Sequence, residues 1–172
     1  MYYKKLIGDN FYLSPCDIDN EYQILTKWIN EDEDITYGNG FYTKLLGDIK
    51  VKEMMEKWNE GPYMFSIVSH KNEFIGHINL FDVYDHEYAT LGIYIGKKYR
   101  HQGYGKKAIK LLVDYAFNYL NLRAIHLNVF SYNNSAYEIY KAIGFKECGR
   151  WHNVRYCNGK YYDEVMMELL RD

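Results

Sequence analysis

Proline and cysteine are scarce in this chain of 172 residues, which contains two prolines and three cysteines. No proline-rich linker or internal repeat divides it. The cysteines, Cys16, Cys148 and Cys157, are odd in number and never spaced as C-x-x-C, which indicates neither a disulfide framework nor a zinc site. The six histidines are scattered, with no pair at i, i+4. We therefore expect no metal.

Long apolar runs and an excess of one charge are also absent. No stretch of 18 apolar residues occurs and the first residues lack an apolar signal core, so we expect a cytoplasmic protein without a membrane partner. A net charge of -2 and a pI near 6.3 give no reason to expect nucleic acid as a partner. The length fits one domain, which we expect to cover residues 1–172.

Hydrophobic periodicity and turn residues divide the chain into alternating elements. We expect strands at 11–13, 63–69, 74–81, 88–95 and 124–130, helices at 18–29, 48–58, 103–119 and 134–143, and a closing hairpin around Asn158-Gly159. The order β-α-α-β-β-β-α-β-α-β-β predicts an α+β (mixed α/β) fold. We expect about seven strands in a twisted mixed sheet, with helices on both faces.

A glycine-containing loop joins the strand at 88–95 to the helix that follows. Backbone N–H groups at a helix N-terminus have no intrahelical partner, so they form a ready site for a phosphate. Glycine lacks Cβ and lets a diphosphate approach the backbone, while arginine and lysine add positive charge. The segment predicted to bind a phosphate-containing cofactor is Arg100, His101, Gln102, Gly103, Tyr104, Gly105 and Lys106.

The loop also satisfies the dinucleotide fingerprint G-x-G-x-x-G/A, with Ala108 as its last member. That interpretation requires an acidic residue about 20 positions further on to hold a ribose. The stretch from Arg123 to Tyr132 contains no Asp or Glu, so we disfavour a nicotinamide-dependent oxidoreductase.

A second segment, 33 residues after Arg100, reads N-N-S-A-Y-E-I-Y from Asn133 to Tyr140 and closes on Gly144-Phe145. R-x-x-G-x-G followed by N-x-x-A-x-x-x-Y and G-F resembles the GNAT superfamily of N-acetyltransferases. The region from Glu87 to Leu169 is similar in particular to the branch of ribosomal-protein N-terminal and spermidine or diamine acetyltransferases.

The resemblance implies acetyl-CoA as cosubstrate and a GNAT fold in which the strands at 88–95 and 124–130 splay apart around the pantetheine arm. It implies that the main chain of Ile93, Tyr94 and Ile95 pairs with pantetheine. Asn133 would contact the same arm. Tyr140, two helical turns further on, would donate a proton to the departing sulfur of CoA.

The residues that would bind the amine and take up its proton are less clearly indicated by the sequence. Many relatives carry glutamate at the position of Thr90, and threonine cannot accept a proton near neutral pH. Four residues remain open as a base acting through water: His77, Asp85, His86 and Glu87. As tentative substrate contacts we select Thr90, Leu91 and Glu31, the last as part of an acidic run suited to a cationic amine.

The leading hypothesis is an N-acetyltransferase that moves acetyl from acetyl-CoA to a primary amine by direct attack in a ternary complex. The amine could belong to a small molecule or a protein N-terminus, and a homodimer is possible. The alternative is a catalytically silent acyl-CoA-binding module. Ribosomal-protein N-termini, polyamines, amino sugars and aminoglycoside-like compounds all stay open as acceptors.

Overall fold

A computed structural model describes residues 1–33, 38 and 45–171. The chain divides into two compact units, residues 1–81 with 92–111 and residues 82–91 with 112–172. Strand β5 (Tyr88–Ile95) and helix α4 (Tyr104–Asn118) each continue from one unit into the other. The expectation of a single domain therefore stays a prediction.

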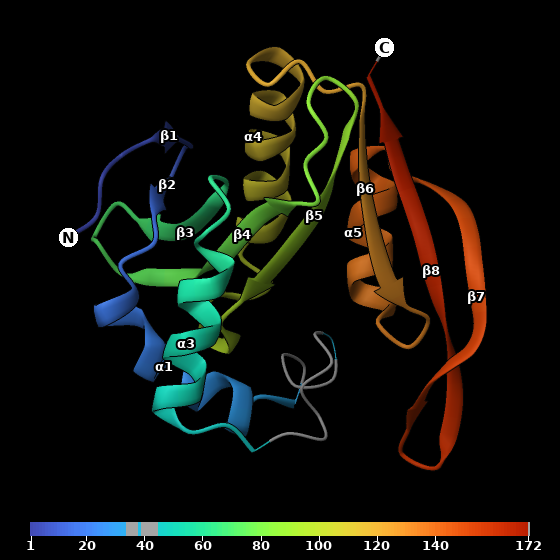
Figure 1. Cartoon of the computed structure of the whole chain (residues 1–172), viewed down its shortest axis with the longest axis horizontal. Helices are drawn as coiled ribbons and strands as arrows, with labels where there is room; N and C mark the ends of the chain where they lie inside the picture. Colours follow the sequence, from blue (N-terminus) through green and yellow to red (C-terminus); the bar gives the residue numbers. More distant parts are fainter. Residues whose placement is uncertain (34–37, 39–44, 172) are drawn as a thin grey trace. The chain divides into compact units, whose positions relative to one another are not determined.

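The first unit contains an antiparallel sheet and a pair of helices (Figure 1). Its elements, besides parts of β5 and α4, are β1 (Leu6–Ile7), β2 (Phe11–Pro15), α1 (Ile18–Glu31), α3 (Asp48–Trp58), β3 (Met64–Ser69), β4 (Phe74–Phe81) and the short 3₁₀ helix η1 (Lys97–Tyr99). β2 pairs with β3, and β3 with β4, both antiparallel. The predicted strands are confirmed, and the two-residue β1, too short to carry a periodicity, is the addition.

Helices α1 and α3 lie side by side because their apolar residues recur at helical spacing. Leu25 and Ile29 of α1 and Val51 and Met55 of α3 form one buried cluster. The Trp28 ring stacks on Phe74 of β4, with centroids 5.2 Å apart. This stacking fixes α1 against the sheet of the first unit.

The second unit contains β6 (Ala124–Phe130), α5 (Asn134–Ile143), β7 (Lys146–Cys157) and β8 (Lys160–Leu170). β8 pairs antiparallel with both β6 and β7. Asn158 and Gly159 have φ of 50° and 78°, the left-handed conformation that a two-residue hairpin turn needs. The predicted closing hairpin is confirmed, and its strands are the longest pair in Figure 1.

The eight strands follow the order β1-β2-β3-β4-β5-β6-β8-β7 in one mixed sheet. β5 and β6 are parallel, and their pairing covers Tyr88–Thr90 with Ala124–His126. Within the described residues the pairing goes no further, although both strands continue. This confirms the predicted α+β fold with a mixed sheet, which has eight strands where about seven were expected. Across the described residues we find no helix that is both long enough and apolar enough to cross a membrane.

Gly76 of β4 provides a test of the close approach between β4 and the end of β5. A Cβ at this position would lie 2.1 Å from the carbonyl oxygen of Tyr94, which is backbone and cannot turn away. Gly76→Ala should lower the free energy of unfolding by about 2 kcal/mol or more, measured by urea denaturation.

Gly61→Ala is the matched control, because a Cβ there meets its nearest atom at 3.6 Å. Its effect should stay within about 0.5 kcal/mol. Equal stability of the two variants would contradict the packing described for β4.

Candidate functional site

Two residues with a left-handed backbone conformation lie in the loop between η1 and α4. His101 has φ of 58° and Gly103 has φ of 81°. The Lys107 N–H bonds to the Gly103 carbonyl and closes the first turn of α4. Within the described part of the chain, the N–H groups of Tyr104, Gly105 and Lys106 have no backbone acceptor. These three donors are therefore available to an anion.

The two glycines of this loop have different requirements. Gly103 needs its positive φ, although a Cβ there would meet nothing within 4 Å. At Gly105 φ is not positive, and a Cβ would lie 3.6 Å from Ile95 Cγ1, an ordinary contact. The described protein thus gives no reason for glycine at 105.

Arg100 has partners within the protein. Its Nε donates to the Ile95 carbonyl at 2.9 Å, and its two terminal nitrogens donate to both carboxylate oxygens of Asp32 at 3.1 and 2.6 Å. Asp32, the residue after α1, is 5% exposed. This bidentate pair ties the loop to the end of α1 and the last residue of β5. The predicted phosphate contact of Arg100 remains a prediction, with this structural role added.

A double-mutant cycle tests that role. Asp32→Ala and Arg100→Ala should each destabilise the protein, because each leaves a partly buried charge without its main partner. The double variant should be more stable than the sum of the two losses predicts, by about 1–3 kcal/mol in urea unfolding. Additivity within about 0.5 kcal/mol would show that the pair does not hold the loop.

Tyr140 lies in α5 of the second unit and is 9% exposed. Its ring meets Phe145 edge to face, with centroids 5.9 Å apart. Burial raises the pKa of Tyr140 to about 12. Among the described residues its hydroxyl has no hydrogen-bond partner, so the group is a protonated donor available to a ligand.

The residues around Tyr140 fix the ends of α5. The Asn133 side chain accepts from the Ala136 N–H at 3.2 Å, which makes it the N-cap. Gly144 ends the helix at φ of 121°, a conformation that favours glycine. The Asn133 amide nitrogen is left to donate elsewhere, so its predicted contact with pantetheine stays a prediction.

The predicted pantetheine strand has partners on its side-chain and main-chain atoms. The Ile95 carbonyl accepts from Arg100, and the Tyr94 hydroxyl lies at Nδ1 of His77. Ile93 is half-buried. Gly92 faces the Asn79 side chain, whose oxygen lies 2.6 Å from where a Cβ would stand, so packing explains this glycine. The predicted binding by Ile93, Tyr94 and Ile95 remains a prediction.

The residues selected as tentative contacts of the amine substrate are spread over both units. Thr90 pairs with His126 in the short β5–β6 ladder, and Leu91 is 4% exposed. Glu31 ends α1 with an exposed carboxylate 3.8 Å from Lys27. The acidic run does not act as one surface, because Asp32 turns inward to Arg100. Its last member, Asp34, lies outside the described residues.

The four candidate bases also differ in their burial. His77 is 1% exposed, and its Nε2 lies 2.6 Å from Oε2 of Glu21. Burial by itself lowers the pKa of His77, but neighbouring Cys16 and Glu21 outweigh it and raise the pKa to about 9. His77 therefore carries a proton at neutral pH and is not a ready base. Asp85, His86 and Glu87 are exposed.

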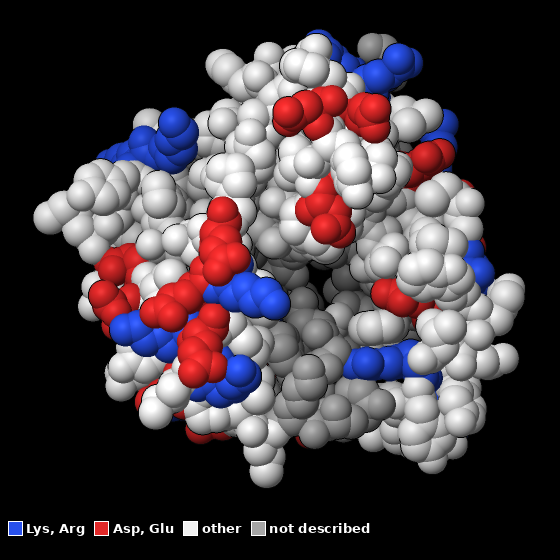
Figure 2. Space-filling model, viewed as in Figure 1, with Lys and Arg blue, Asp and Glu red and all other residues white. Residues whose placement is uncertain are grey.

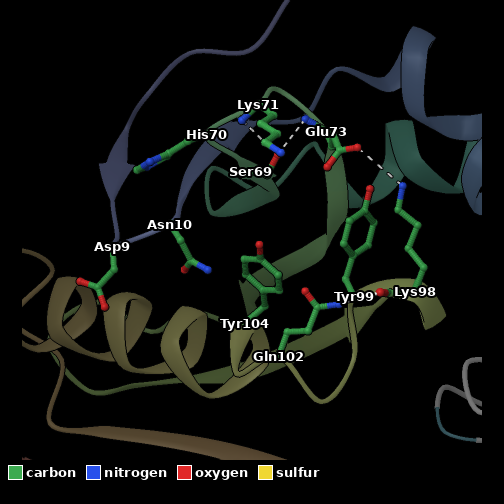
Figure 3. Close-up of a pocket in the computed structure, with 10 residues that line it drawn as sticks. All are labelled: Asp9, Asn10, Ser69, His70, Lys71, Glu73, Lys98, Tyr99, Gln102 and Tyr104. Carbon is green, nitrogen blue, oxygen red and sulfur yellow. Dashed lines mark hydrogen bonds and ion pairs between the residues drawn. The ribbon is translucent and has the colours of Figure 1, made fainter.

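A cavity of about 510 Å³ adjoins the loop in the first unit (Figure 3). Gln102 and Tyr104 contribute to its wall, and its charges are mixed: Lys98 lies 3.7 Å from Glu73, while Lys71 and Asp9 add one charge of each sign. Figure 2 likewise shows acidic and basic side chains interspersed on the visible face. The cavity has no excess of cations, so we place the candidate anion site on the N–H groups of α4.

One cluster has no counterpart in the sequence patterns. Cys16, Glu21 and His77 come from three elements of the first unit, and one ligand atom of each lies within 4.8 Å of the others. Its members form neither a histidine pair at i, i+4 nor a C-x-x-C motif. The 56 positions between Glu21 and His77 carry no local signal.

Comparison with known proteins identifies the family of the chain. A model of the acetyltransferase (GNAT) family matches residues 22–145. The spermidine N(1)-acetyltransferase of Vibrio cholerae is 31% identical over 108 residues, which cover 62% of this chain and 62% of that enzyme. The chain thus spans less than two thirds of the length of this curated relative.

Solved structures show the same fold over nearly the whole chain. The spermidine N-acetyltransferase of Vibrio cholerae, in complex with CoA and spermine, has a TM-score of 0.79 at 22% identity and covers 95% of this chain and 96% of its own. The ribosomal L7/L12 alpha-N-protein acetyltransferase RimL, in complex with CoA, has a TM-score of 0.82 at 14% identity with the same coverage.

Proposed function

Because the chain belongs to the acetyltransferase (GNAT) family, we propose that it transfers an acetyl group from acetyl-CoA to a primary amine by direct attack in a ternary complex. The observation that carries the proposal is the start of α4. Three N–H groups there lack a backbone acceptor within the described residues, beside a glycine at 105 that the protein itself does not require.

The first step is binding. The N–H groups of Tyr104, Gly105 and Lys106 donate to the diphosphate of CoA, where the helix dipole adds partial positive charge. The left-handed residues His101 and Gly103 aim these groups outward. The Asp32 carboxylate largely neutralises Arg100, so main-chain donors carry most of the recognition.

The second step is transfer. Acetyl-CoA supplies the acetyl group as a thioester, whose C–S bond breaks as the new C–N bond forms. Main-chain N–H groups of β5, beyond its ladder with β6, polarise the carbonyl oxygen. Tyr140 protonates the departing thiolate, and the attacking nitrogen releases its proton to water. The phenol is suited to donation because burial keeps it protonated.

The state of two described residues near the candidate acceptor site bears on the type of amine. Thr90 cannot take a proton, and the pKa of His77 is raised to about 9. An α-amine, with a pKa near 8, is partly neutral at physiological pH, whereas a lysine-like amine near 10.4 is mostly charged. We therefore favour an α-amino group, as on a protein N-terminus or a small molecule. One curated relative is named for spermidine, and one solved structure with the same fold is named for a ribosomal protein.

The rival function is an acyl-CoA-binding module without turnover, favoured by threonine at position 90. Release of free thiol from acetyl-CoA distinguishes the two. The assay panel contains N-terminal peptides, spermidine and a peptide whose only free amine is lysine. Acetylation of an α-amine at pH 7.5 supports the proposal. Binding of acetyl-CoA without thiol release from any amine would support the rival.

Tyr140→Phe tests the acid. The variant should lose about 10²- to 10⁴-fold in kcat, the usual contribution of a general acid, because the thiolate must leave unprotonated. The Kd for CoA should change less than threefold, since the ring and its contact with Phe145 remain. Tyr137→Phe, one helical turn earlier with a partly exposed ring, is the control and should keep kcat. Full activity in Tyr140→Phe would remove this residue from the mechanism.

Gly105→Ala tests the anion site. The Kd for CoA should rise about tenfold or more, roughly 1.4 kcal/mol, because the methyl group stands where the diphosphate approaches. The free energy of unfolding should stay equal or rise by up to about 1 kcal/mol, because alanine favours a helix and the contact with Ile95 is ordinary. Gly61→Ala should leave CoA binding unchanged. Unchanged binding in Gly105→Ala would contradict the placement of the diphosphate.

A further inference from the structure

Three ionisable side chains meet inside the first unit, in a cluster that the proposed reaction does not use. Cys16 lies between β2 and α1, Glu21 in the first turns of α1, and His77 in the middle of β4. Cys Sγ, a carboxylate oxygen and a ring nitrogen all lie within 4.8 Å of one another. The helix α1 and the sheet meet at this point.

Burial makes the cluster unusual. Glu21 is 0% and His77 1% exposed. Ionised groups are rarely buried to this extent unless they are paired or coordinate a metal, because removing a charge from water costs several kcal/mol. Cys16 is partly exposed, so the cluster has one side toward solvent.

Each buried member has an outer contact that fixes one atom and leaves the other facing inward. Ser66 Oγ donates to Oε1 of Glu21 at 2.5 Å, which leaves Oε2. The Tyr94 hydroxyl lies at Nδ1 of His77, which leaves Nε2. Outer hydrogen bonds of this kind orient the ligands in metal sites. The two inward atoms, Oε2 and Nε2, lie 2.6 Å apart.

The donor set selects the class of ion. A thiolate sulfur and an imidazole nitrogen suit Zn²⁺ and its neighbours, while Mg²⁺ and Ca²⁺ prefer oxygen alone. Three protein ligands of mixed Cys, His and carboxylate type, with one open position, match the zinc sites that retain a water.

We propose that Cys16 Sγ, Glu21 Oε2 and His77 Nε2 bind one Zn²⁺, with water in the fourth position on the exposed side. Tetrahedral bonds of about 2.0–2.3 Å place ligand atoms about 3.3–3.7 Å apart. The glutamate and histidine therefore separate by about 0.7 Å as the ion replaces their hydrogen bond. The partly exposed Cys16 moves inward by about 1 Å, and the Cys16 thiol and the His77 imidazolium each release one proton to solvent as the ion binds.

The consequence is a cross-link within the first unit. The ion joins the segment before α1, α1 itself and β4, so zinc stabilises the folded chain by RT ln(1 + [Zn²⁺]/Kd). Tyr94 is in contact with His77, so zinc also fixes a side chain of β5.

The test uses the full chain after treatment with EDTA. Zn²⁺ should bind at one equivalent and raise Tm. Co²⁺ should give the near-ultraviolet absorption of a cobalt–thiolate bond and visible bands of a tetrahedral site. Cys16→Ser should abolish the thiolate band and weaken zinc binding by about 100-fold. Cys148→Ser, at an exposed cysteine, is the control and should bind as the unmodified chain does.

Ser66→Ala provides a second test should Cys16→Ser fold poorly. It removes the outer contact of Glu21 and should weaken zinc binding about 10- to 100-fold. Absence of a Tm shift with Zn²⁺, or equal binding by the Cys16 and Cys148 variants, would overturn the proposal. Both readouts are independent of CoA, so a failure of the proposed transferase activity leaves this test intact.

Discussion

Three backbone N–H groups at the start of α4, which have no backbone acceptor among the described residues, are the feature on which the account depends. An N–H group has to find an acceptor, and the described residues offer the first three of this helix no backbone acceptor. The chain holds them outward through the left-handed backbone at His101 and Gly103. The guanidinium nitrogens of the preceding Arg100 donate to Asp32 and to the carbonyl at the end of β5, which holds the loop in place. We propose that a diphosphate completes this arrangement.

Hydrogen bonds and ion pairs between buried polar groups fix the positions of the helices and strands of the first unit. Arg100 and Asp32 connect α1 to the loop, and Glu21 connects α1 to β3 and β4 through Ser66 and His77. Such contacts are directional, so they define a single arrangement of helix and strand. The same contacts limit the chemistry available: His77 is held protonated by its neighbours and cannot also accept a proton from an amine.

Local signals were enough to predict most of the fold. α3, α5, β4, β5 and β6 have the expected bounds, because each carries its own periodicity and a marked end such as Gly144. Strand β1 has two residues and no period to recognise.

Long-range pairs could not be predicted from local patterns. Arg100 was interpreted as a free cation, yet its carboxylate partner is 68 positions away. The acidic run that includes Glu31 was interpreted as suited to a cationic amine, yet its neighbour Asp32 pairs with Arg100 while Glu31 stays exposed. The cluster at His77 is likewise assembled only by the fold. These are cases where tertiary contacts, rather than the identity of a residue, decide what it does.

The most direct test of the account is a titration of the ¹⁵N-labelled chain with CoA, followed by the amide signals of Tyr104, Gly105 and Lys106. The account predicts that these signals shift downfield in parallel and saturate at one equivalent, as N–H groups that gain an anionic acceptor do. Saturable CoA binding that leaves these three amides unmoved would contradict it.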